Sequence, residues 1–153
     1  MADYRKQIEV SMESIAELEK YLEEEQYSFM ELTIGKHHAS EGYIIEKNGN
    51  VYEFCYSERG KKEVIKSFSK EQDLVEYALK TLSANKWNRA HLVAWVWTED
   101  EIQQAEQELI TNDVGFERND IPNYSQGRTA YRIFVFGRDV EKLTEFKKKY
   151  FRK

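Results

Sequence analysis

Residues 98–117 carry seven carboxylates and no lysine or arginine, although 23 of the 153 residues in the chain are basic. Composition alone predicts about three basic residues in a stretch of this length. Clustered carboxylates attract basic partners and accelerate their association. The stretch therefore predicts either a docking surface for a basic partner or the solvated outer face of a helix. Its acidic residues are Glu99, Asp100, Glu101, Glu106, Glu108, Asp113 and Glu117.

Two aromatic residues near this stretch favour a binding surface. Trp97 ends an apolar segment just before the stretch, and Tyr124 lies in the polar segment that follows it. Tryptophan and tyrosine often dominate the binding energy of protein interfaces, because they bury large areas while keeping a polar group. We therefore predict a partner-binding site made of Trp97, Glu99, Asp100, Glu101, Glu108, Asp113 and Tyr124.

The histidines and the cysteine of this chain do not have the spacing that is typical of catalytic or metal-binding sites. His37 and His38 are adjacent, so on a strand their rings would point to opposite faces, and His91 has no ligand-like spacing to them. Cys55 lies in the strand-like segment VYEFCY, where a small buried thiol is the common case. We therefore expect no catalytic residue, no metal site, no cofactor and no enzymatic activity.

Two patterns bear on nucleic-acid chemistry. A nuclease of the PD-(D/E)xK type needs an acid-x-Lys pair on one strand, but Glu63 and Lys66 are three residues apart and would face opposite ways. Tyr52, Phe54 and Tyr56 share one face of a strand, as base-stacking residues do, but basic residues are not interleaved around them. The net charge of −5 also favours a protein partner over nucleic acid.

Strands are predicted in two parts of the chain. Residues 28–68 contain four β-prone segments, with turns around Asn48-Gly49 and Gly60, and predict an antiparallel meander. Residues 91–97 and 131–136 are apolar on both faces, which predicts strands in the middle of a sheet.

Four helices are expected around these strands. The first covers the apolar repeat from Ile8 to Leu22, and Ser69 and Thr98 are predicted capping residues of the second and third. The order α-β-β-β-β-α-β-α-β-α predicts one α+β domain over residues 1–153, with a mixed sheet and helices packed on it. The polar segment 117–129 is expected to be the longest loop.

One segment, residues 42–82, supports a comparison with a known family. It contains the hairpin at Asn48-Gly49, the turn Glu58-Arg59-Gly60, the run from Ile65 to Phe68, and the pair Glu76-Tyr77. In these features it resembles small immunity proteins of bacterial polymorphic and contact-dependent toxin systems. The resemblance implies a cytoplasmic, non-enzymatic protein that binds a toxin domain, frequently a basic nuclease, and blocks its active site.

The composition of the chain also predicts its cellular location and the kind of partner it binds. The chain has no run of 18 apolar residues, no apolar signal segment in residues 1–14, and a single cysteine. These features predict a cytoplasmic protein without a membrane partner. We predict that it neutralises a basic protein, with a toxin nuclease as the expected target. The alternatives are an enzyme or nuclease-like domain acting on nucleic acid, a regulatory interaction domain, and a homodimer.

Overall fold

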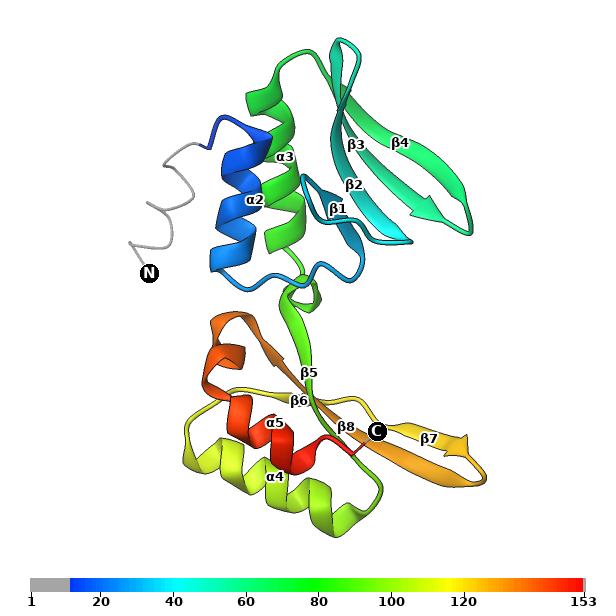
Figure 1. The fold of residues 1–153 in the computed structure, drawn as a ribbon, viewed down its shortest axis with the longest axis vertical. Helices are drawn as coiled ribbons and strands as arrows, with labels where there is room; N and C mark the ends of the chain where they lie inside the picture. The colour runs from blue at the N-terminus through cyan, green and yellow to red at the C-terminus, as the bar shows by residue number, and fades with distance from the viewer. Residues whose placement is uncertain (1–11, 153) are drawn as a thin grey trace. The chain divides into compact units, whose positions relative to one another are not determined.

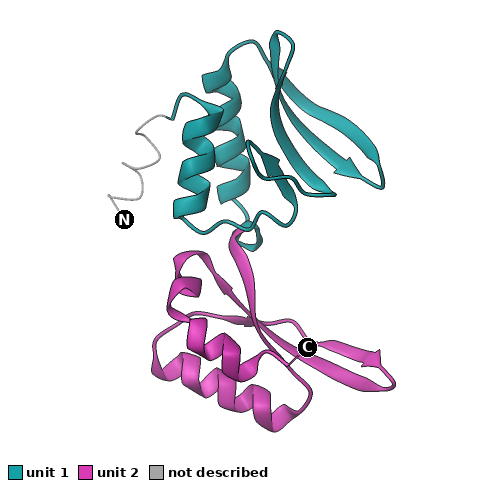
Figure 2. Ribbon diagram, viewed as in Figure 1, with its two compact units in different colours: residues 1–88 teal, residues 89–153 magenta. Residues whose placement is uncertain are grey.

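Residues 12–152 are described by the computed structural model, and the chain divides into two compact units between Asn88 and Arg89 (Figure 2). Each unit has its own sheet, helices and hydrophobic core. The predicted α+β class is therefore confirmed, and the single domain over residues 1–153 stays a prediction. No helix among the described residues is both long and apolar enough to cross a membrane.

The first unit packs two helices on a four-stranded sheet (Figure 1). Its elements are α2 (Ile15–Glu24), β1 (Leu32–Ile34), β2 (Gly42–Asn48), β3 (Val51–Glu58), β4 (Lys61–Phe68) and α3 (Glu71–Ser83), followed by the 3-10 helix η1 (Lys86–Arg89). Leu18 and Leu22 of α2 and Leu74 of α3 are fully buried, and they share one core with Ile45 and Phe54 of the sheet. The helical spacing of these leucines places them on the faces that meet the sheet.

Helix α2 begins with a capping box. The Ser14 hydroxyl accepts the N–H of Glu17, and the Glu17 carboxylate accepts the N–H of Ser14, both at 3.1 Å. Part of the predicted first helix, residues 8–11, lies outside the described residues.

Helix α3 begins differently from the prediction, because Ser69 does not cap it. The N-cap is Lys70, whose side chain makes no capping hydrogen bond. The carboxylate of Glu71, in the first turn, instead accepts the N–H of Ile15 at 2.8 Å. This bond joins the starts of α2 and α3.

The sheet of the first unit is mixed, and the fully antiparallel meander predicted over residues 28–68 is wrong at β1. β2, β3 and β4 are antiparallel neighbours, whereas β1 pairs with β2 in parallel. The chain reverses at Gly35, where φ is +56°, and Ala39 N–H then donates to the Thr33 hydroxyl at 2.9 Å. The chain thus retraces the short strand β1 before β2 begins.

Both hairpin turns of the first unit were predictable from the sequence. Gly49 and Asn50 join β2 to β3, one residue beyond the predicted position. Arg59 and Gly60 join β3 to β4, with φ values of +53° and +77°. Positive φ at both central residues is what a type I′ turn requires.

The second unit packs two helices against one face of an antiparallel sheet (Figure 1). Its elements are β5 (Ala90–Val96), α4 (Glu99–Thr111), β6 (Glu117–Arg118), β7 (Ile121–Ser125), β8 (Arg128–Phe136), the 3-10 helix η2 (Gly137–Lys142) and α5 (Thr144–Tyr150). The strand order is β5-β8-β6, and β7 also pairs with β8. Ile102 of α4 and Phe146 of α5 share a core with Ile133 and Val135 of β8.

Only one of the two strands predicted for the middle of a sheet lies there. β8 is central, whereas within residues 12–152 β5 pairs with one strand, β8, apart from an isolated bridge between Trp95 and Phe151. β5 and β6 are not adjacent, because β8 lies between them in a split β-α-β arrangement. The predicted loop 117–129 is mostly strand, and Gln126-Gly127 turns β7 into β8 with φ values of +50° and +77°.

Helix α4 begins and ends at residues of the acidic stretch. Thr98 caps it as predicted, with its hydroxyl accepting the N–H of Glu101 at 3.2 Å. Asp113 follows the helix with a left-handed φ of +57°. This conformation assigns Asp113 a part in ending the helix.

Substitution of Gly60 tests the type I′ turn. Gly60→Ala is expected to lower the free energy of unfolding by about 1 kcal/mol, because a left-handed φ costs residues with a Cβ roughly 1–2 kcal/mol. Chemical denaturation measures this change. Gly115→Ala is the matched control, since its added Cβ also meets nothing within 4 Å and its φ is not left-handed. Equal destabilisation by both variants would contradict the turn assignment.

Candidate functional site

Side chains alternate across the strands of the second unit, so residues that do not face the helices point to the opposite face of the sheet. Ile133 and Val135 of β8 face the helices. Arg132 directly precedes Ile133 and is in register with Trp95 of β5, and both therefore project from the other face. We call the residues that meet there the aromatic–arginine cluster: Trp95, Trp97, Tyr124, Arg128 and Arg132.

Three aromatic rings form the centre of the cluster. Tyr124 packs edge-on against Trp95, with ring centroids 5.1 Å apart, and lies 5.9 Å from the ring of Trp97. The two tryptophans are themselves 6.2 Å apart at an interplanar angle of 70°. These are favourable geometries for aromatic pairs. Trp95 is buried, whereas the side chain of Tyr124 is 45% exposed, so the cluster has a fixed base and an accessible outer ring.

Two arginines cover the tryptophan rings. The Arg128 guanidinium lies 4.1 Å from the ring centroid of Trp97, and that of Arg132 lies 5.6 Å from that of Trp95. Arg132 is held further by Asn119, whose backbone and side-chain oxygens accept its N–H groups at 2.7 and 2.8 Å. A guanidinium stacked on an indole, as at Arg128, presents its in-plane donors to a carboxylate or carbonyl.

Trp97 is anchored to the end of the chain. Its indole N–H donates to the backbone oxygen of Arg152 at 3.2 Å. The Arg152 guanidinium in turn lies 3.2 Å from the carboxylate of Glu101. Arg152 therefore connects the aromatic–arginine cluster to the start of α4. It also brings two predicted site residues, Trp97 and Glu101, into one network.

At least four of the seven carboxylates in the acidic stretch are ion-paired within their own unit, namely Glu99, Glu101, Glu106 and Glu108. Glu108 is ion-paired with Lys149, and this contact raises the pKa of the lysine. The C-terminal segment thus supplies cations to both Glu101 and Glu108. Because these two carboxylates are already paired, reversing their charges would place a basic residue against Arg152 or Lys149. A loss of partner binding in such variants would therefore not identify a docking surface.

Arg118 neutralises the other side of α4. Its guanidinium binds Asp120 in a bidentate manner, at 3.0 and 2.6 Å, and lies 3.3 Å from Glu106 and 3.9 Å from Glu99. The hydrogen bonds to Asp120, and then the interaction with Glu106, raise the pKa of Arg118. Asp120 also accepts the backbone N–H of Arg132 at 3.1 Å. Arg118 therefore links the acidic helix to the strand that carries the cluster.

The predicted site residues thus fall into three groups. Trp97 and Tyr124 are in contact, and Glu101 joins them through Arg152. Glu99 is paired with Arg118, whereas Asp100 is exposed at the helix start. Glu108 and Asp113 lie toward the other end of α4, more than about 10 Å along the helix from Glu101.

Sequence reasoning missed Trp95, Arg128 and Arg132 as site residues. The alternation in HLVAWVW placed Trp95 and Trp97 on one face, which was a usable signal for the first of these. The arginines lie in the segment predicted as loop and strand, and only the pairing of β7 and β8 with their neighbours brings them onto the tryptophans.

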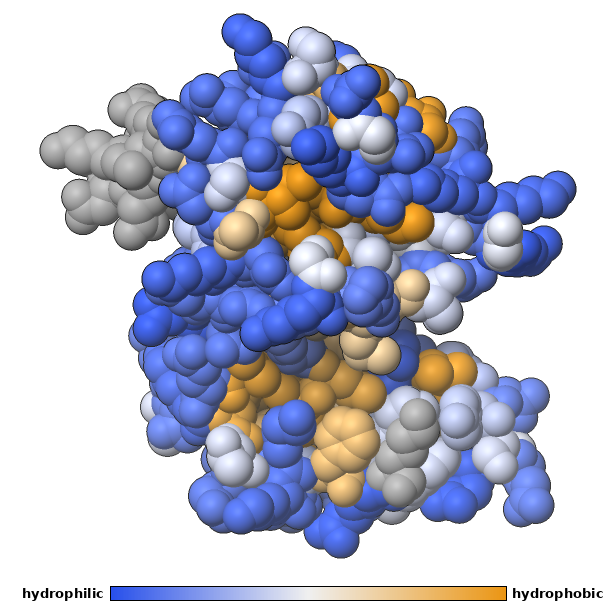
Figure 3. All heavy atoms as spheres, turned by 45° about the horizontal axis from the view of Figure 1, so that its top comes forward, coloured by the Kyte–Doolittle hydropathy of each residue, from blue (hydrophilic) through white to orange (hydrophobic). Residues whose placement is uncertain are grey.

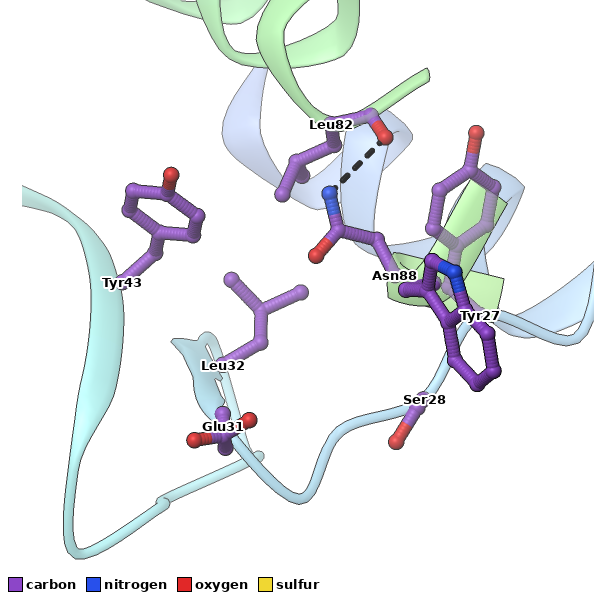
Figure 4. Close-up of a pocket in the computed structure, with 8 residues that line it drawn as sticks. Tyr27, Ser28, Glu31, Leu32, Tyr43, Leu82 and Asn88 are labelled. Carbon is purple, nitrogen blue, oxygen red and sulfur yellow. Dashed lines mark hydrogen bonds between the residues drawn. The ribbon is translucent and has the colours of Figure 1, made fainter. Parts of the chain in front are cut away.

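The enclosed pocket shown in Figure 4 is too small for a typical small-molecule substrate. The pocket in Figure 4 lies in the first unit and has a volume of about 40 Å³. Tyr43, Glu31 and Ser28 border it, and Asn88 donates to the Leu82 carbonyl beside it at 3.0 Å. A cavity of this size holds a few waters, whereas small-molecule sites measure roughly 300–1,000 Å³.

The single cysteine, Cys55, is unreactive in this environment. It is fully buried, and burial raises the pKa of its thiol, so little thiolate forms near neutral pH.

The second unit has an open hollow of about 400 Å³ between α4 and α5. Leu143, Phe146 and the Glu108–Lys149 pair border it. Figure 3 shows that hydrophobic residues reach the surface in both units within a mostly hydrophilic surround.

Comparison of the chain with protein-family models, with curated proteins and with solved structures finds no match. The geometry and chemistry of the aromatic–arginine cluster are therefore the basis on which a function is proposed.

Substitution of Arg118 tests the ion-pair network. Arg118→Gln is expected to lower the free energy of unfolding by about 1–2 kcal/mol, because partly buried, charge-assisted hydrogen bonds contribute more than exposed ones. Denaturant titration measures the loss. The control is Arg138→Gln, which removes an exposed arginine paired with Glu141 and should cost roughly 0–0.5 kcal/mol. A loss in Arg118→Gln no larger than that in the control would argue against the network.

Proposed function

We propose that this chain is a non-enzymatic binding protein whose partner seats on the aromatic–arginine cluster, and that it acts as an immunity protein for a toxin domain. The observation that carries the binding proposal is the stack of Arg128, Trp97 and Tyr124 over the buried Trp95. Tryptophan, tyrosine and arginine are the residues most enriched among interface hot spots.

The cluster also has the rigidity that strong binding favours. Trp97 is fixed by its hydrogen bond to Arg152, and Arg132 is fixed by Asn119 and by the ring of Trp95. Little side-chain entropy is then lost when a partner covers these groups. Tyr124 is the exception, since it is the most exposed ring of the three and can insert into a recess of the partner.

The net negative charge of the chain also favours a basic partner. This charge comes from residues outside α4. Residues 1–88 contain 17 acidic and 12 basic residues, whereas residues 89–153 contain 11 of each. The net charge of −5 therefore belongs to the first unit. Long-range attraction depends on net charge, and it accelerates the association of oppositely charged proteins. We assign attraction of a basic toxin to this charge, and the contact energy to the cluster.

A second candidate function is the binding of single-stranded nucleic acid. Aromatic side chains beside arginines on a sheet face are the chemistry that stacks unpaired bases. Arg128 over Trp97 is the specific observation in its favour. The equal numbers of acidic and basic residues in the second unit weigh against it, because such binding needs a positive surface.

Affinity capture with matched baits tests the proposal. The wild-type chain should retain a basic protein from a lysate of the source cell, and retention should fall as salt rises. Co-expression with this chain should then relieve the growth arrest that the captured protein causes. Retention of single-stranded RNA in place of a protein would support the second candidate instead.

Tyr124→Ala is expected to weaken the complex by about 30-fold or more, as truncation of a hot-spot residue does. Titration calorimetry with the captured partner measures the change. Tyr56→Ala is the control, because Tyr56 is the same residue type, is 37% exposed and lies in the first unit. We expect the control to bind like the wild type. If Tyr124→Ala binds as tightly as Tyr56→Ala, the partner does not seat on the cluster.

A further inference from the structure

A second group of convergent side chains lies in the first unit, away from the aromatic–arginine cluster in sequence. Glu19 and Glu23 are four residues apart on α2, so they share one face of that helix. His37, from the connection between β1 and β2, places its ring against both carboxylates. Its Nε2 atom lies 2.6 Å from Oε2 of Glu23 and 3.7 Å from Oε2 of Glu19. All three side chains are partly buried.

The imidazole of His37 is fixed from two directions. The ring of Phe29 stacks on it, with centroids 3.7 Å apart and planes inclined by 13°. The backbone of His37 exchanges hydrogen bonds with Ile34 at 3.0 and 2.9 Å, which fixes the position of its Cα. The ring is therefore held in place before any ligand arrives.

The carboxylate of Glu19 is fixed as well. Its Oε2 accepts the backbone N–H of Lys36 at 2.9 Å. The chain approaches this carboxylate so closely that a Cβ at Gly35 would lie 2.3 Å from Oε1, and the φ of +56° also favours glycine there. Hydrogen bonds of this kind orient the ligands of metal sites and are part of their design.

We propose that Glu19, Glu23 and His37 bind a first-row transition-metal dication, with Zn²⁺ as the probe. An imidazole nitrogen and two carboxylate oxygens are a ligand set that Zn²⁺ accepts, usually in tetrahedral geometry with water as a fourth ligand. Mg²⁺ is disfavoured, because it prefers six oxygen ligands in octahedral geometry.

The spacing of the ligand atoms fits such an ion. Bonds of 2.0–2.1 Å in a tetrahedral arrangement separate neighbouring ligand atoms by about 3.3 Å. The two distances from Nε2 of His37, 2.6 and 3.7 Å, lie on either side of this value. The ligand atoms of all three residues lie within 4.8 Å of one another.

Lys36 is a cation that competes for one of the proposed ligands, Glu23. Its ammonium lies 3.4 Å from Oε2 of Glu23, and its side chain is 75% exposed. Hydrogen bonding to His37, and then to Lys36, lowers the pKa of Glu23. Because the lysine side chain extends into solvent, it can leave without disturbing the core. The bound ion would then tie the β1–β2 connection to α2.

Titration calorimetry of the metal-free full chain with ZnCl₂ tests the site. We expect one saturable site, and at least about tenfold weaker binding in each of Glu19→Gln, Glu23→Gln and His37→Gln. Lys36→Gln should bind more tightly than the wild type, because a competing cation is removed. MgCl₂ in the same titration should show no saturable binding.

Three control variants test whether other side chains bind the Zn²⁺. Glu24→Gln and His38→Gln alter exposed neighbours of the proposed ligands, and Cys55→Ser removes the single thiol. These three variants should bind Zn²⁺ like the wild type. Circular dichroism verifies that each variant is folded, and the wild type should melt at a higher temperature with Zn²⁺ than without it.

Absence of saturable Zn²⁺ binding by the wild type would overturn the proposal. So would full affinity in His37→Gln, or loss of binding in Cys55→Ser or His38→Gln. Weaker binding in Lys36→Gln would overturn the assigned role of the lysine as a competitor.

Discussion

The alternation of side chains along β8 is the constraint on which the second unit depends. Ile133 and Val135 point toward α4 and α5 and complete the hydrophobic core, which obliges Arg132 to point the other way. Within the described part of the second unit, α4 and α5 pack on this face of the sheet, and the other face collects Trp95, Trp97 and Tyr124 with their arginines. The same pattern that folds the unit therefore assembles the candidate interface, and a shift of one residue in the β8 register would exchange the two faces.

Ion pairs within the second unit give the acidic stretch a structural role in addition to the docking role that the sequence predicted. Glu99, Glu101, Glu106 and Glu108 of this stretch are paired with basic residues of β6 and of residues 149–152, namely Arg118, Lys149 and Arg152. Exposed pairs of this kind add little stability individually, but together they orient α4 and secure the chain end beside Trp97. In the proposed complex, the acidic helix supports the aromatic–arginine cluster from within its unit, and the net negative charge of the first unit is assigned the long-range attraction.

The sequence allowed local features to be predicted better than long-range ones. The turn at Gly60, the cap at Thr98 and the fully buried leucines of α2 follow from short-range spacing and conformational preference, and they are confirmed. The parallel pairing of β1 and the central place of β8 depend on how the chain returns through space, so periodicity alone did not reveal them. The pair Glu108–Lys149 spans 41 residues of sequence, and the approach of His37 to Glu19 depends on the fold of the β1–β2 connection. Trp97 and Tyr124 were both chosen for a predicted site because they are large aromatic residues near the same stretch, and the structure brings their rings within 5.9 Å of each other.

The central claim is that a protein partner covers the aromatic–arginine cluster. Hydroxyl-radical footprinting of the chain, free and in complex with the captured partner, tests it most directly, because it reports side-chain exposure residue by residue. The account predicts that the oxidation rates of Tyr124 and Trp97 fall severalfold in the complex, while that of Tyr56, which is 37% exposed in the first unit, stays the same. Unchanged oxidation of Tyr124 together with protection of Tyr56 would contradict the account and place the interface on the first unit.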